Sequence, residues 1–168
     1  MGKRSRDKGA VFEREVAARF RDLTGLNDSI RRGRQDSKER FVGGTHEPDV
    51  VGVPGLWIEA KRVASTPRLA TWWGQAVADA EKARLDPVVV FRVDRGPLMF
   101  LMSLARVKFQ TSAVALRDFS LTRYPSTRVR WGELLRADAA QAFVMELTPP
   151  AVLGRWGVFE ELWRSRFQ

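Results

Sequence analysis

The chain carries two carboxylates and an ammonium group at a spacing that could perform phosphodiester chemistry: Asp49, Glu59 and Lys61. Alternate residues of a β-strand share a face, so a strand through this segment would put Glu59 and Lys61 together and Ile58 on the other face. Mg²⁺ prefers hard oxygen ligands, and there it would polarise a phosphodiester and acidify a bound water. An ammonium group beside it would orient that water and offset charge on the phosphorane. The pattern predicts metal-dependent hydrolysis.

Asp49 joins the other two residues only if the turn before Glu59 has a suitable length. Two short apolar runs flank Pro54-Gly55, a pair typical of a hairpin turn. A two- or four-residue loop would put Asp49 on the wrong face, whereas a three-residue loop over residues 53–55 would place it opposite Glu59. The chemistry requires the three-residue loop or a bulge, and Gly55 suits the left-handed position of such a loop.

A third carboxylate, Glu13, lies in a segment whose apolar residues follow helical spacing. The apolar stripe and the glycine that would cap its end predict a helix over residues 9–23: Phe12, Val16, Phe20, Leu23 and Gly25. Glu13 borders this stripe and has no basic residue three or four positions away, whereas Glu15 can pair with Arg19 in an ordinary surface ion pair. We interpret the missing local partner of Glu13 as a sign that a metal ion supplies the counter-charge.

The remaining apolar patterns predict the elements around this hairpin. The polar and basic residues 27–47 favour a long connection in which only Phe41 and Val42 could form a short strand. Beyond the hairpin, the patterns predict helices over about residues 69–84, 131–142 and 155–167, and strands over about residues 87–93, 98–102 and 143–147. We expect one α/β domain over residues 1–168, with a mixed central sheet flanked by helices and with extra C-terminal helices.

Charge and composition narrow the class of protein. The formal net charge is +9 and the sequence pI is about 10.9, which favours a polyanionic partner such as nucleic acid. The chain has no cysteine, which excludes disulfides and thiolate metal sites and leaves oxygen ligands for any metal. No segment approaches the roughly 18 consecutive apolar residues of a membrane-spanning helix. We expect an intracellular protein without a membrane role.

Taken together, these motifs resemble those of the PD-(D/E)XK nuclease superfamily. The likeness rests on Pro48-Asp49, on Glu59-Ala60-Lys61 and on the preceding helix with Glu13. Within the superfamily the chain is more similar to archaeal-type Holliday junction resolvases and their phage relatives, whose first helix carries a motif like residues 8–15, KGAVFERE. The resemblance covers about residues 6–102 and implies a restriction-endonuclease-like fold. The basic insertion before Asp49 and the extension over about residues 129–168 depart from the family pattern.

The resemblance implies a role for each matching residue. The implied metal ligands for Mg²⁺, with Mn²⁺ able to substitute, are Glu13, Asp49 and Glu59, and Lys61 would assist the attacking water. The implied DNA phosphate contacts are Arg14 and an arginine of the Arg31-Arg32 pair, with Arg34 in the same basic stretch. The family also implies a homodimer, because resolution of a four-way junction needs two symmetric cuts. The leading expectation is a phage or cellular resolvase of branched DNA.

Two other functions fit the same residues. The first keeps the chemistry and changes the substrate, as in a repair, restriction or phage DNA-processing nuclease. The second is a DNA-binding protein that keeps the fold without catalysis, which would require a broken site. None of the four positions Glu13, Asp49, Glu59 and Lys61 is broken, so the sequence favours an enzyme.

Several residues admit both a functional and an ordinary interpretation. Gln75, on the second predicted helix, could face the site or be one more exposed glutamine, and His46 could contact phosphate or be a solvated loop residue. Trp73 has the spacing of a core residue, whereas Trp72 could pack in the core or stack on a base. The basic run at residues 3–6 is typical of a disordered tail, although such a segment would also strengthen phosphate binding.

Overall fold

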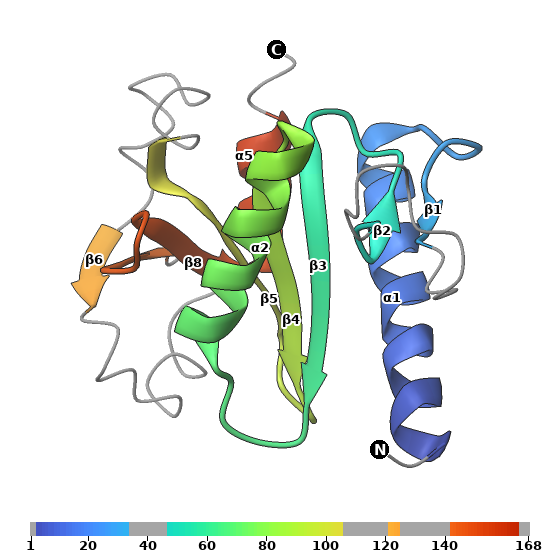
Figure 1. Ribbon diagram of the computed structural model, residues 1–168, viewed down its shortest axis with the longest axis horizontal. Coiled ribbons are helices and arrows are strands. Elements are labelled where there is room, and N and C mark those ends of the chain that lie inside the picture. Colours follow the sequence, from blue (N-terminus) through green and yellow to red (C-terminus); the bar gives the residue numbers. More distant parts are fainter. Residues whose placement is uncertain (1–2, 34–46, 106–120, 125–141, 165–168) are drawn as a thin grey trace.

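The computed structural model describes residues 3–33, 47–105, 121–124 and 142–164, with the backbone alone for residues 3–6 and 121–124 (Figure 1). These residues form three helices and eight strands. Their bounds are α1 Lys3–Thr24, β1 Arg31–Arg32, β2 Val50–Val51, β3 Leu56–Val63, α2 Leu69–Ala83, β4 Asp86–Val93, β5 Leu98–Ser103, β6 Leu121–Tyr124, β7 Ala142–Met145, β8 Ala151–Arg155 and α5 Trp156–Arg164. Within the described residues, no helix combines the length and the apolar composition that crossing a membrane requires.

The strands form one mixed sheet in the order β1-β2-β3-β4-β5-β8-β7-β6. The pairs β3–β4 and β6–β7 are parallel, and the other neighbouring pairs are antiparallel. In Figure 1, β1 and β2 lie at the end of the sheet beside α1, and β6 lies at the opposite end. The mixed α/β sheet expected from the sequence is therefore confirmed.

Helices cover both faces of the sheet. One apolar core joins α1 and α5 to one face, where the ring of Phe20 meets the rings of Trp156 and Phe159 edge-on at 5.1 and 5.6 Å between centroids. A second core joins α2 to the other face. Trp73 is buried there, and Trp72 packs against Phe91 with 5.8 Å between ring centroids. Both tryptophans are therefore core residues, which answers the question left open for Trp72.

The crossover from β3 through α2 to β4 sets the centre of the sheet. Because β3 and β4 are parallel, with Glu59 beside Val89, the chain must return along a helix between them. Helix α2 packs through small and aromatic side chains and is capped at its C-terminal end by Arg84, whose φ of 55° is left-handed. The helix and the two following strands agree closely with the elements predicted over residues 69–102.

Three elements differ from the sequence-based expectation. The basic residues 3–6 are not a disordered tail but begin α1, because lysine and arginine favour helix and residues 3–8 contain no glycine or proline. Arg31–Arg32 forms the edge strand β1 within residues 27–47, which were expected to be a connection. This strand has no apolar pattern and is held by backbone pairing with β2. Strand β6 was also not expected, and its side chains lie outside the described residues.

The C-terminal part also differs in one element. The expected strand near residues 143–147 and the closing helix are present as β7 and α5, but β8 between them was not expected. Gly154 lies inside the apolar strand β8, where a Cβ would lie 2.7 Å from the Phe100 ring. The helix expected near residues 131–142 and the short strand at Phe41 and Val42 fall outside the described residues, save that Ala142 begins β7.

Candidate active site

The hairpin of β2 and β3 brings Asp49 opposite Glu59. Val50 pairs with Ile58 in the antiparallel register, so the next pair outward is Asp49 with Glu59. The same register makes residues 53–55 the three-residue loop, and Gly55 has the left-handed φ of 74°. The loop length and the left-handed glycine that the chemistry required are both confirmed.

Backbone contacts on both sides hold Asp49 in place. Its Oδ2 accepts a hydrogen bond of 2.8 Å from the backbone N–H of Ala60 on β3. Its carbonyl oxygen accepts a hydrogen bond of 2.9 Å from the N–H of Gly33, just beyond β1. A Cβ at Gly33 would lie 2.0 Å from the carbonyl oxygen of Pro48, so only glycine allows this approach. The end of β1 therefore fixes the strand that carries Asp49.

Glu59 and Lys61 lie on one face of β3, as the strand period predicts. Glu59 is 8% exposed, and its Oε1 accepts a hydrogen bond from the Nζ of Lys61. Leu56 and Ile58 point to the other face, where they join the core under α1. The ammonium group is thus bound directly to a carboxylate of the site.

Glu13 faces the site from α1 and is bound to an arginine that the sequence did not identify as its partner. It is 6% exposed, and its Oε2 accepts a hydrogen bond from the Nε of Arg32 on β1. Glu13 has no basic neighbour within its helix, as expected, but Arg32 supplies a counter-charge that the sequence analysis had assigned to a metal ion alone. The partner is 19 residues away in sequence and becomes adjacent only when β1 joins the sheet.

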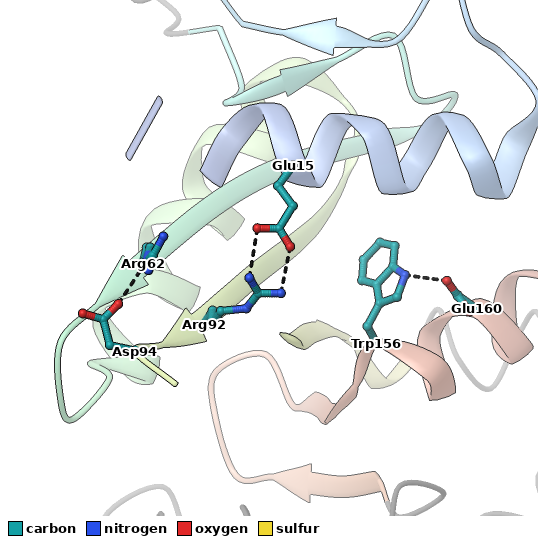
Figure 2. A network of polar contacts seen from close by, with 6 residues as sticks. All are labelled: Glu15, Arg62, Arg92, Asp94, Trp156 and Glu160. Carbon is teal, nitrogen blue, oxygen red and sulfur yellow. Dashed lines mark hydrogen bonds and ion pairs between the residues drawn. The ribbon is translucent and has the colours of Figure 1, made fainter. Parts of the chain in front are cut away.

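Glu15 also has a different partner from the expected Arg19. Arg92 on β4 donates from Nη1 and Nη2 to the two carboxylate oxygens of Glu15, at 2.9 and 2.8 Å (Figure 2). The guanidinium carbon of Arg92 also lies 5.7 Å from the centre of the Phe12 ring. This pair of hydrogen bonds joins α1 to β4 in the middle of the sheet. Glu15, which accepts both, lies two residues after Glu13 on the same helix. The expected surface ion pair of Glu15 is therefore a link between two layers of the fold.

The three carboxylates share one electrostatic environment. The pKa of Asp49 is raised from 3.8 to about 6, first because burial disfavours the charged form and next because Glu59 is close. Glu13 adds a smaller increase, while the Ala60 N–H and Lys61 act in the opposite direction. An added cation would relieve the repulsion among these acids, so the donor chemistry fits a hard divalent metal ion.

The side chains of Glu13, Asp49 and Glu59 lie too far apart in this structure to bind one metal ion together. Among the residues that the structure describes, no three acidic or histidine side chains stand close enough together to hold one. Two of the acids contact cations instead, because Glu59 accepts from Lys61 and Glu13 accepts from Arg32. A bound metal would compete with these two contacts for the carboxylate oxygens.

The other candidate residues lie around this centre. Arg31 is exposed and donates to Glu47 Oε1 at 3.1 Å and to the carbonyl oxygen of Arg32 at 3.2 Å. Arg14 is exposed on α1. Gln75 is exposed on α2 and, within the described residues, forms no hydrogen bond to the acidic side chains. Arg34 and His46 lie outside the described residues.

Sequence reasoning missed Glu47 and Arg92. Glu47 binds Arg31 just before Asp49, but a glutamate in a polar stretch gives no distinctive signal. Arg92 did carry one, since it is a charged residue inside the apolar run of β4. A charge in a buried strand requires a partner, and Glu15 is that partner.

Comparison with known protein families identifies one family. The family profile described as "Phage putative PDDEXK endonuclease" matches residues 4–126 of the 168. The chain belongs to this family. The matched range contains all four candidate residues, Glu13, Asp49, Glu59 and Lys61.

Membership confirms the superfamily and the phage relation expected from the sequence, and it indicates a nuclease. Neither the curated proteins nor the solved structures gave a significant match to the chain. The closer likeness of the chain to junction resolvases stays a prediction.

Proposed function

We propose that this phage-type PDDEXK endonuclease cleaves DNA with Mg²⁺ held by Asp49, Glu59 and Glu13, and with Mn²⁺ able to substitute. The observation that carries the proposal is the register that sets Asp49 opposite Glu59, with Lys61 bound on the same face. When bound, the metal supplies Lewis acidity toward the scissile phosphate and lowers the pKa of a coordinated water.

The residues of the chain have distinct tasks in this reaction. Asp49 and Glu59 contribute the negative charge that attracts the cation, and burial keeps water from screening that charge. The contact of Lys61 with Glu59 holds the ammonium group at the site, where it orients the attacking water and offsets charge on the phosphorane. The net charge of +9 draws the DNA backbone toward the protein.

We further propose a four-way DNA junction as the leading substrate and a homodimer as the active form. Both follow from the sequence likeness to junction resolvases, whose two symmetric cuts require two active sites. The family description names an endonuclease without a substrate, so the substrate must be determined by testing several DNA structures side by side.

A cleavage panel tests the chemistry and the substrate together. Labelled four-way junction, flap, nicked duplex and linear duplex are incubated with Mg²⁺, with Mn²⁺ and with EDTA. Paired symmetric incisions on the junction in the presence of metal support the resolvase function. Cleavage of another substrate supports the nuclease and refutes the resolvase, and binding without cleavage by either metal refutes the enzyme.

Substitution of Lys61 tests its assignment. Lys61→Ala should reduce the cleavage rate about 100-fold or more while DNA affinity stays close to that of the wild type, because the ammonium acts on the transition state. Lys82→Ala is the matched control, since Lys82 is an exposed lysine that pairs with Asp79 on α2. Equal losses of binding and cleavage in Lys61→Ala would contradict the catalytic role.

Sedimentation analysis with and without junction DNA measures the oligomeric state and so tests the proposed homodimer.

A further inference from the structure

The two arginines of β1 differ in which of their donors are already used. Both terminal nitrogens of Arg31 donate within the protein, one to the carbonyl oxygen of Arg32 and one to Glu47. Arg32 uses its inner nitrogen, Nε, to contact Glu13. Its Nη1 and Nη2 have no hydrogen-bond partner among the described residues. Arg32 therefore keeps the edge of the guanidinium that matches two phosphate oxygens.

If exposure alone decided which arginine binds phosphate, Arg31 would be favoured over Arg32. The side chain of Arg31 is 53% exposed and that of Arg32 is 32% exposed. A phosphate that bound Arg31 through Nη1 and Nη2 would share both nitrogens with acceptors of the protein, Glu47 and the Arg32 carbonyl oxygen. The terminal nitrogens of Arg32 are not shared in this way among the described residues, and about a third of its side chain is accessible to a ligand.

Glu13 restricts the freedom of the Arg32 side chain. The carboxylate is nearly buried, and its helix is held to the sheet by the apolar core and by the contact between Glu15 and Arg92. A free arginine loses rotamer entropy when it binds, at a cost of about 0.5 to 1.5 kcal/mol for an immobilised side chain. An arginine already fixed at Nε has lost part of that entropy before DNA arrives.

We propose that Glu13 has a second role, in which it positions Arg32 to bind a DNA phosphate through Nη1 and Nη2 whether or not a metal is present. The inference rests on the proposed function for its DNA ligand. It makes Glu13 a positioning residue for binding, in addition to its proposed contact with the metal. The Glu13–Arg32 pair would place a phosphate beside the acidic centre before catalysis.

The test compares two substitutions that remove the same charge. Glu13→Gln keeps an oxygen that accepts from Arg32 Nε, whereas Glu13→Ala removes it. DNA affinity is measured in EDTA by fluorescence anisotropy with a labelled duplex and a labelled four-way junction. We expect Glu13→Gln to bind about three- to tenfold more tightly than Glu13→Ala, from the entropy of one ordered side chain.

The Arg32→Ala background isolates the pair from other effects of Glu13. In that background the Gln and Ala variants should bind DNA equally. Arg32→Ala itself should weaken binding about tenfold, and the slope of log affinity against log salt concentration should fall by about one unit, the value for one phosphate contact. A difference between Gln and Ala that persists without Arg32 would overturn the proposal, because it would reflect packing at position 13. Equal binding of Gln and Ala in the presence of Arg32 would overturn it as well.

Asp79 supplies the matched control, because it is an acid on α2 that pairs with the exposed Lys82 at 3.0 Å. Asp79→Asn and Asp79→Ala should bind DNA equally. Thermal unfolding in EDTA verifies that each variant is folded, and Arg32→Lys, which keeps the charge without the planar edge, should remain weaker than the wild type. Failure of the wild type to cleave any substrate with metal refutes the proposed function, whereas this comparison without metal refutes only the role of Glu13 in binding.

Discussion

Replacement of Asp49 by asparagine should stabilise the metal-free protein while abolishing its response to metal. The carboxylate is partly buried beside Glu59, and its pKa is raised from 3.8 to about 6. That difference corresponds to about 3 kcal/mol of unfavourable free energy for the charged form in the folded state. Asparagine keeps an oxygen for the Ala60 N–H and removes the charge. Because its amide N–H₂ is also partly desolvated, the expected gain is about 1 to 3 kcal/mol.

The pH dependence follows from the direction of the shift. At about pH 3 and below, the Asp49 carboxyl is mostly protonated in both the folded and the unfolded state, so it costs almost nothing. As the pH rises from about 4 to about 6, the unfolded chain ionises first and the stability of the wild type falls. Above about pH 6 the cost is constant. The advantage of Asp49→Asn should therefore be full near pH 8 and should nearly vanish at about pH 3.

Urea unfolding in EDTA at several pH values measures this difference, and addition of Mg²⁺ measures the metal response. Mg²⁺ should stabilise the wild type, because it binds the folded state only, and should leave Asp49→Asn unchanged. Asp79→Asn, with its exposed partner Lys82, serves as the control and should change stability by less than about 0.5 kcal/mol. An Asp49→Asn variant less stable than the wild type near pH 8 in EDTA would refute the argument from burial and repulsion.

Two further substitutions test the parts of the fold that position the site. Arg92→Ala should destabilise the protein by about 1 to 3 kcal/mol in urea unfolding, because Glu15 loses both hydrogen bonds in a partly buried place, and Arg92→Met should lose less. A loss under about 0.5 kcal/mol would show that the pair is not structural. Gly33→Ala should cost about 2 kcal/mol or more and remove the Mg²⁺-induced stabilisation, since its Cβ would meet Pro48. The control is Gly74→Ala on α2, which has open space and should be neutral or stabilising; equal behaviour of the two variants would refute the steric argument.

The acidic hairpin could be predicted from the sequence because its determinants are local. The strand period puts Glu59 and Lys61 on one face, and the spacing of Pro54-Gly55 between two apolar runs allows the three-residue loop that brings Asp49 opposite Glu59. The helix of Glu13 was equally evident from its apolar stripe. Each of these inferences needs only residues within about one turn or one hairpin of each other.

The partners of the charged residues required the tertiary structure. Glu13 contacts Arg32 and Glu15 contacts Arg92, and neither pair lies within the reach of one helix turn. The pairs form because β1 docks on β2 and because α1 packs against β3, where the side chain of Arg92 on the neighbouring β4 reaches it, and neither arrangement leaves a periodic signal in the sequence. Strand β8 was missed for a similar reason, since Gly154 is explained only by the Phe100 ring against it.

The chain by itself therefore determined which residue types are available for chemistry and which of them share a local face. Only the assembled sheet decided how these charges are compensated, because the energy of an ion depends on its burial and on the groups that other segments bring to it. The raised pKa of Asp49 shows the difference, since it arises from burial together with carboxylates on β3 and α1. A charge pattern is local in sequence, whereas an electric field is a property of the whole fold.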